Sequence, residues 1–139
     1  MDVYWYTMGM ATTKTAILYS RVSTDDQADS GLGLADQGEK LQALAKVNDW
    51  HSTVQLVDDG YSAKSLDRPA MTEALNMLAT GQADALAAVK LDRLTRSVED
   101  LAKLMSLSDK QGWRLVIHDL GVDTSTAVSY THLTLPTKA

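Results

Sequence analysis

The chain of 139 residues contains no cysteine, which excludes disulfide bonds, cysteine-ligated zinc and thiol nucleophiles. A chain without thiols fits a reducing compartment, so we expect a cytoplasmic protein. No apolar run approaches the roughly 18 residues that a membrane span needs, so no membrane partner is expected. The N-terminus lacks a basic segment followed by an apolar one and is therefore not read as a signal peptide.

Positive charge is also scarce, because 13 Lys and Arg stand against 18 Asp and Glu, a net charge of −5 at neutral pH. This balance argues against a protein that binds nucleic acid mainly through a net positive charge. Only five arginines occur. Four of them lie beside expected strand ends or loops: Arg21, Arg68, Arg93 and Arg96. Since a guanidinium presents a planar fork suited to phosphate, their positions matter more than the net charge.

Strand and helix patterns alternate along the chain. Expected strands cover residues 15–23, 53–57, 85–89 and 114–118, and expected helices cover 35–49, the segment from Pro69 to Gly81, and 97–111. This alternation predicts an α/β fold with a mainly parallel sheet of four to five strands flanked by helices.

One domain is expected at this length. Residues 1–13 show no period, and we expect a leader outside the fold. The domain itself is expected to span residues 14–126. Residues 127–139 continue no pattern, and Pro136 blocks a helix there, so we expect a tail that is foreign to the fold or disordered.

The first expected strand ends in an unusual group of side chains. Alternate residues of a strand share a face, so Tyr19, Arg21 and Ser23 are expected to point the same way. The carboxyl edge of a parallel sheet is where α/β proteins bind ligands. A cation beside a hydroxyl would favour an anion and stabilise a developing alkoxide. The alternative is a strand end with a hydroxyl cap and a solvated arginine.

A second polar cluster, residues 90–96 (KLDRLTR), follows the third expected strand at the same sheet edge. If this segment is helical, Arg93 and Arg96 share a face and Asp92 reaches Arg96. Convergent guanidiniums without matching carboxylates suggest a phosphate site. The alternative is an ion-pair array on the surface, which is common.

These motifs together carry a resemblance. Residues 19–27 (YSRVSTDDQ) and 90–96 resemble the two signatures of the serine site-specific recombinases, the resolvase and invertase family. Residues 58–63 (DDGYSA) and 67–69 (DRP) match the stretch between them, and Gln37 fits a further family position. The resemblance covers residues 15–126, so the expected domain would be the recombinase catalytic domain.

The resemblance implies DNA strand cleavage and rejoining. Ser23 would attack a DNA phosphodiester, form a 5′-phosphoserine link and release a 3′-hydroxyl. The roles implied for other residues are a phosphate clamp by Arg21, Arg68, Arg93 and Arg96, orientation of arginines or proton transfer by Asp92, and support by Tyr19, Gln27 and Gln37. No metal, nucleotide or other cofactor is implied. The partners implied are DNA and, in a full-length parent, further subunits of a dimer or tetramer.

The chain departs from the family after Thr126, where the long helix and DNA-binding domain of other members do not follow. We therefore expect a truncated catalytic domain with little or no recombination activity alone. One rival is a non-catalytic module that pairs with recombinase subunits. Another is a receiver-like or Mg²⁺-dependent phosphotransfer domain built on Asp58 and Asp59, which leaves the arginines unexplained.

Overall fold

A single mainly parallel sheet organises the computed structural model, which describes residues 15–24, 33–120 and 122–123. Its strands are β1 (Ala16–Val22), β2 (Thr53–Asp59), β3 (Ala85–Ala88), β4 (Arg114–Ile117) and β5 (Val122–Asp123). The order across the sheet is β2-β1-β3-β4-β5. The first four strands are parallel, and β5 pairs antiparallel with β4. The predicted sheet is confirmed, and the short fifth strand gave no periodic signal of its own.

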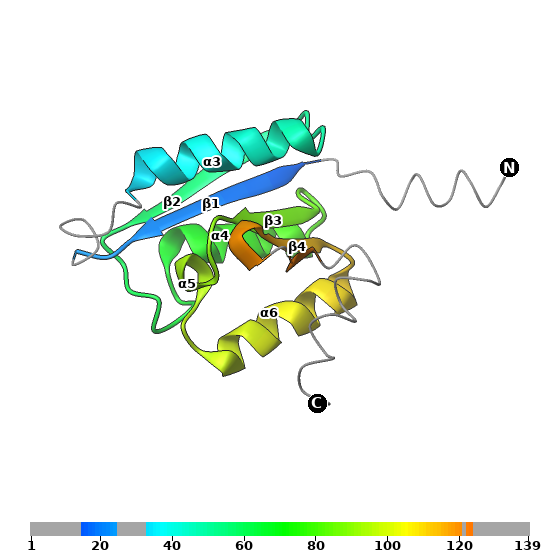
Figure 1. The fold of residues 1–139 in the computed structure, drawn as a ribbon. Coiled ribbons are helices and arrows are strands. Elements are labelled where there is room, and N and C mark those ends of the chain that lie inside the picture. Colours follow the sequence, from blue (N-terminus) through cyan, green and yellow to red (C-terminus); the bar gives the residue numbers. More distant parts are fainter. Residues whose placement is uncertain (1–14, 25–32, 121, 124–139) are drawn as a thin grey trace, which may run out of the picture.

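The helices cover both faces of this sheet. They are α3 (Leu34–Val47), α4 (Pro69–Ala79), the single turn α5 (Leu91–Leu94), α6 (Val98–Gln111) and the 3₁₀ turn η1 (His118–Leu120). Figure 1 shows α3 above the sheet and α4 with α6 below it. The three long helices lie where the sequence places them, because each carries an apolar stripe between clear stop signals.

Local chemistry explains where these helices begin and end. Pro69 opens α4, where its missing N–H and fixed φ are tolerated. The Ser97 hydroxyl caps α6 by accepting the Asp100 N–H at 3.2 Å. Gly112 closes α6 with a φ of 76°, a left-handed conformation that favours glycine.

Strand β1 is buried on both faces and separates two cores. Ile17 and Tyr19 pack on the side of α4 and α6, among residues such as Met71. Leu18 packs on the other side, in the cluster that contains Leu41 of α3. Near-continuous burial of this kind is typical of a central parallel strand.

The connections of β1 change direction at one edge of the sheet. The chain passes through α3 to β2 on one side of β1, then through α4 to β3 on the other side. In α/β sheets such a reversal marks the place at the carboxyl ends of the strands where ligands bind, and we call this place the crevice. The pairing of β1 with β3 also stops at Leu18 with Ala87, before β1 ends at Val22. The end of β1 therefore needs other partners on that side.

Two predicted segments lie outside the described residues: the leader at 1–13 and the tail at 127–139. The boundaries of the domain at 14 and 126 therefore stay predictions. Among the described residues, no helix is long and apolar enough to cross a bilayer.

Candidate active site

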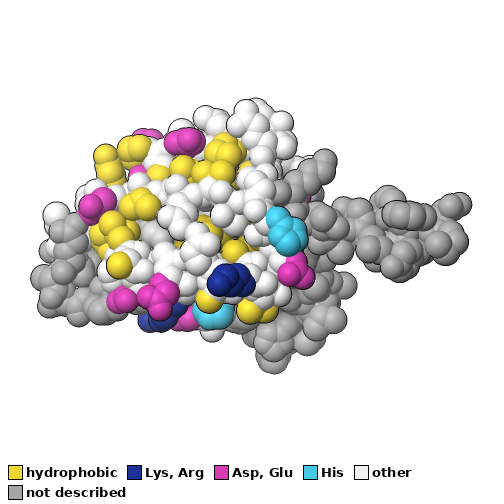
Figure 2. Space-filling view, turned by 90° about the horizontal axis from the view of Figure 1, so that it is seen from above, with side chains coloured by type: hydrophobic (Ala, Val, Ile, Leu, Met, Phe, Trp, Pro, Cys, Tyr) yellow, Lys and Arg dark blue, Asp and Glu magenta, His cyan; other side chains and the backbone are white. Residues whose placement is uncertain are grey.

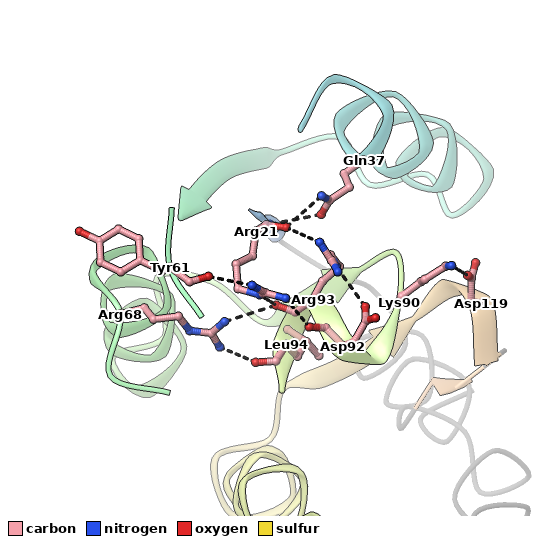
Figure 3. Close-up of polar contacts among 9 residues, drawn as sticks. All are labelled: Arg21, Gln37, Tyr61, Arg68, Lys90, Asp92, Arg93, Leu94 and Asp119. Carbon is pink, nitrogen blue, oxygen red and sulfur yellow. Dashed lines mark hydrogen bonds and ion pairs between the residues drawn. The ribbon is translucent and has the colours of Figure 1, made fainter. Parts of the chain in front are cut away.

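The guanidinium of Arg21 forms the centre of the crevice and is almost fully buried, with 1% of the residue exposed. Its Nε donates to the Arg93 carbonyl at 3.2 Å, Nη1 to the Tyr61 carbonyl at 2.7 Å and Nη2 to the Asp92 carbonyl at 2.8 Å. Figure 3 shows these contacts converging from three segments of the chain. One side chain thus fastens β1 to α5 and to the loop after β2.

Gln37 of α3 supplies the partner that the end of β1 needs. Its Oε1 accepts the Arg21 backbone N–H at 3.2 Å, and its Nε2 donates to the Arg21 carbonyl at 3.0 Å. A side-chain amide offers the same donor and acceptor as a peptide group, so Gln37 continues the hydrogen bonding where β3 has stopped. Arg93 Nη1 donates to the same Arg21 carbonyl at 2.8 Å.

The cluster after β3 is arranged differently from the sequence prediction. The turn α5 ends at Leu94, and Thr95 is extended with φ −160° and ψ 155°. Arg93 is therefore buried while Arg96 is exposed, and the two do not share a helix face. Asp92 pairs with Arg93 at 3.0 Å between Oδ1 and Nε. The predicted pairing of Asp92 with Arg96 is wrong, because it assumed a longer helix than the single turn that forms.

Arg68 approaches the same point from the start of α4 and is 2% exposed. Its Nη1 lies 3.5 Å from the Arg93 carbonyl, Nη2 donates to the Leu94 carbonyl, and Nε has no hydrogen-bond partner. The guanidinium carbon lies 5.5 Å from the centre of the Tyr19 ring, within range of a cation–π contact. Burial lowers the pKa of Arg68 below its usual value, because desolvation disfavours the charged form.

Tyr19 and Asp58 anchor the element that carries Arg68. The Tyr19 hydroxyl donates to Asp58 Oδ2 at 2.7 Å. The Asp58 carboxylate also accepts the N–H groups of Ala70 at 2.8 Å and Met71 at 3.1 Å. Burial, and to a lesser extent the hydrogen bond to Asp58, raises the pKa of the Tyr19 phenol. The hydroxyl therefore stays protonated and donates a hydrogen bond to Asp58.

These contacts indicate that Asp58 is a structural residue rather than part of a receiver-like or Mg²⁺-dependent phosphotransfer site. Its oxygens are engaged by backbone and phenol donors, and the residue is 1% exposed. No group of three potential metal-ligating side chains gathers anywhere among the described residues. Sequence reasoning missed this support role. Strand alternation was the available signal, since it places Asp58 on the same face as Leu56, which packs against the core.

Ser23 follows directly after β1, and the residue is half-buried. It therefore stands at the carboxyl end of the strand whose Arg21 organises the crevice. Gln27, which was predicted as a supporting residue, lies outside the described residues. The structure thus brings together five residues, with Tyr19 supporting Arg68: Arg21, Gln37, Arg68, Asp92 and Arg93. It does not bring Arg96 into this cluster, because the side chain of Arg96 is exposed beyond the turn α5.

The chemistry of this cluster favours an anion. Backbone carbonyls accept N–H groups of Arg21 and Arg68, but a carbonyl carries no charge that would neutralise a guanidinium. Three buried guanidiniums at the end of one strand make this place favourable for an anion such as a phosphate oxyanion. Figure 2 shows the molecule from the side of α3, where positive side chains are few and separated. This face therefore shows no dense cluster of positive side chains.

Comparisons with known proteins agree with this arrangement. The family model described as the resolvase N-terminal domain matches residues 16–135. The chain is 32% identical over 110 residues to the transposon Tn917 resolvase of Enterococcus faecalis, and the match covers 79% of this chain and 52% of that protein. It therefore spans about half the length of that resolvase.

Solved structures give the same result. The N-terminal catalytic domain of TP901-1 integrase is 34% identical, with a TM-score of 0.77 and coverage of 88% of this chain and 90% of that one. A resolvase family site-specific recombinase from Streptococcus pneumoniae is 25% identical, with a TM-score of 0.70 and coverage of 90% and 86%.

Proposed function

The chain belongs to the resolvase N-terminal domain family, that of the serine recombinase catalytic domains, and from this we propose that it breaks and rejoins DNA strands through Ser23. The observation that carries the proposal is the convergence of three buried guanidiniums, Arg21, Arg68 and Arg93, at the end of the strand that leads into Ser23. The alternatives of a solvated arginine or a surface ion-pair array do not fit such burial.

In the proposed step, the Ser23 Oγ attacks the phosphorus of a DNA phosphodiester. The bond from Oγ to phosphorus forms as the bond from phosphorus to the 3′-oxygen breaks. The serine proton is lost and the departing 3′-oxygen gains one, so the products are a 5′-phosphoserine link and a free 3′-hydroxyl. Attack by a 3′-hydroxyl on the phosphoserine reverses the step. The number of phosphoester bonds is conserved, so rejoining requires no external energy source.

The arginines would supply the electrostatic part of this reaction. A serine hydroxyl is a weak nucleophile at neutral pH, and phosphoryl transfer depends mainly on positioning and on charge stabilisation. We assign Arg21, Arg68, Arg93 and the exposed Arg96 to stabilise the phosphate and the leaving oxygen. Asp92 would orient Arg93 through the contact at 3.0 Å.

The supporting residues would act through these groups. Gln37 holds the backbone of Arg21, and Tyr19 holds Asp58, which fixes the start of α4 next to Arg68. Gln27 keeps a supporting role in the proposal. The catalytic unit is residues 14–126, its partners are DNA and further copies of a recombinase subunit, and the cysteine-free composition supports a cytoplasmic location.

A covalent-adduct assay tests the proposal. The full chain is fused through its C-terminus to an unrelated sequence-specific DNA-binding domain and mixed with duplexes that carry two inverted sites for that domain at graded spacings. A nick close to the centre lets the cleaved fragment diffuse away and traps the adduct. We expect a protein–DNA adduct that survives denaturation, and mass spectrometry should place a 5′-phosphonucleotide on Ser23.

Control variants and EDTA test whether the adduct depends specifically on Ser23. Ser23→Ala should abolish the adduct, whereas Ser62→Ala, which changes an exposed hydroxyl in the loop after β2, should leave it intact. EDTA should not reduce the yield if arginines supply the charge. Absence of an adduct from a folded, DNA-bound fusion would overturn the proposal in favour of a non-catalytic module, and a metal requirement would overturn the arginine assignment.

A further inference from the structure

A depression of about 490 Å³ lies next to the candidate active site, at the carboxyl ends of β3 and β4. It is lined by Lys90, Leu91, Asp92, Thr95, Arg96 and Asp119. Figure 3 shows Lys90 and Asp119 on the side of α5 away from Arg68 and Tyr61. Asp92 links the two places, because it lines the depression while pairing with Arg93 in the crevice. We call this feature the Lys90 depression.

The positively charged side chains of the Lys90 depression form at most weak ion pairs with the acidic residues beside them. Lys90 Nζ lies 3.9 Å from Asp119 Oδ2, and the two side chains are 43% and 39% exposed. An ion pair at this distance and exposure is screened by solvent and holds its partners loosely. Asp92 is engaged by Arg93 and not by Arg96. Lys90 can therefore exchange its carboxylate for a phosphate with little loss.

The lining also fits a ligand that has an apolar part in addition to an anionic group. Leu91 adds apolar surface to the lining and is half-buried against the core. The volume falls within the range of roughly 300–1,000 Å³ that small-molecule sites occupy. A nucleotide combines an anionic phosphate with the C–H surface of its sugar and the apolar faces of its base, which matches this combination.

We propose that the Lys90 depression holds the nucleotide adjacent to the scissile phosphate, with Lys90 contacting the neighbouring backbone phosphate and Leu91 packing against its sugar or base. This inference rests on the proposed function, since it extends the path of the same DNA strand from the crevice. Lys90 thereby positions the strand and takes no part in the bond changes. Asp119 competes with the strand for Lys90.

A binding titration that needs no cleavage tests this inference. The full chain, labelled with ¹⁵N and carrying Ser23→Ala, is titrated with a thymidine trinucleotide at low salt and followed by amide chemical shifts. We expect the largest shifts at Lys90, Leu91, Thr95 and Asp119. Lys90→Gln should weaken binding about tenfold and reduce the salt dependence by about one released counterion. Asp119→Asn should tighten binding several-fold, because it removes the competing carboxylate.

Matched variants and ligands make the result specific. Lys103→Gln changes an exposed lysine of α6 in a different depression and should leave the affinity unchanged. Thymidine without phosphate should not bind measurably, and inorganic phosphate should bind more weakly than the trinucleotide. Equal affinity for phosphate and trinucleotide would reduce the depression to a simple anion site and overturn the inference. Equal losses from Lys90→Gln and Lys103→Gln would do the same.

The adduct assay distinguishes this inference from the proposed function. If Lys90→Gln raises the DNA concentration needed for adduct formation but not the maximal rate, the positioning role holds. If wild-type chain forms the adduct while Lys90→Gln changes neither binding nor yield, the inference fails and the function stands. If the trinucleotide binds as described but no adduct forms, the strand contact stands and the chemistry assigned to Ser23 fails.

Discussion

Asp58 Oδ2 accepts the Tyr19 hydroxyl at 2.7 Å, and the same carboxylate receives two N–H groups from the first turn of α4. Three elements are joined by this arrangement, because Tyr19 belongs to β1 and Asp58 to β2. Arg68 immediately precedes α4, so the bond between Tyr19 and Asp58 fixes the point from which this guanidinium enters the crevice. The stability of the sheet and the geometry of the site are therefore coupled.

Asp58→Asn should destabilise the fold. The amide keeps the shape but removes a buried charge that accepts N–H groups at a helix N-terminus, and its own NH₂ faces donors. We expect a loss of about 2–3 kcal/mol in the free energy of unfolding, measured by urea denaturation. Asp109→Asn, at an exposed position in α6, should change it by less than about 0.5 kcal/mol. Equal effects of both variants would contradict the anchoring role.

Tyr19→Phe should change how stability depends on alkaline pH. The pKa of the Tyr19 phenol is raised in the folded state, so its contribution to stability is full below the unfolded pKa of about 10 and is lost as pH rises above that value. We expect the difference in unfolding free energy between wild type and Tyr19→Phe to be constant from pH 7 to 9 and to fall above pH 10. The other tyrosines cancel in this difference, so a flat profile would refute the prediction.

Gln37→Leu should loosen the end of β1. Leucine keeps the volume of the side chain but leaves the Arg21 N–H without its acceptor and removes one donor from the Arg21 carbonyl. We expect a loss of about 2–4 kcal/mol in unfolding free energy and faster hydrogen exchange of the Arg21 amide. Gln42→Leu, on the exposed face of the same helix, serves as control and should leave that amide protected.

Arg21→Lys should inactivate the site although the charge is kept. A single ammonium cannot donate to three carbonyls in the plane of a guanidinium fork, so α5 and its Arg93 would lose their fixed position. We expect the adduct yield to fall at least about 100-fold, as for a misplaced catalytic group. Arg114→Lys, at the start of β4, should retain most of the yield. An active Arg21→Lys variant would show that the fork geometry is dispensable.

Two glycine variants should shift stability in opposite directions. Gly112→Ala forces a side chain into a φ of 76°, so we expect a loss of about 1 kcal/mol in unfolding free energy. Gly38→Ala lies inside α3 with open space around the added methyl group, so we expect a gain of about 0.5–1 kcal/mol. Thermal unfolding of the two variants and wild type measures both. A stabilising Gly112→Ala would contradict the left-handed cap.

The alternating order of strands and helices, and the edge of the sheet where polar groups gather, could be predicted from the sequence alone. Strand and helix patterns are local properties of segments of 4–14 residues, so the alternation from 15 to 118 could be predicted without the fold. The carboxyl ends of parallel strands meet at one edge by geometry, which placed Arg21 and residues 90–96 together. The family resemblance then singled out Gln37, whose buried bonds to Arg21 explain why an amide stands there.

The contacts that each guanidinium makes depend on tertiary packing and could not be predicted in this way. The length of α5 depends on packing, so the separation of Arg93 from Arg96 could not follow from i,i+3 spacing. The role of Asp58 depends on α4 being folded against the end of β2, a contact between segments that local periodicity does not encode. The Lys90 depression depends likewise on Lys90 and Asp119 meeting across the ends of two strands. Contacts over such separations arise from the packing of complete elements, and sequence spacing alone cannot specify them.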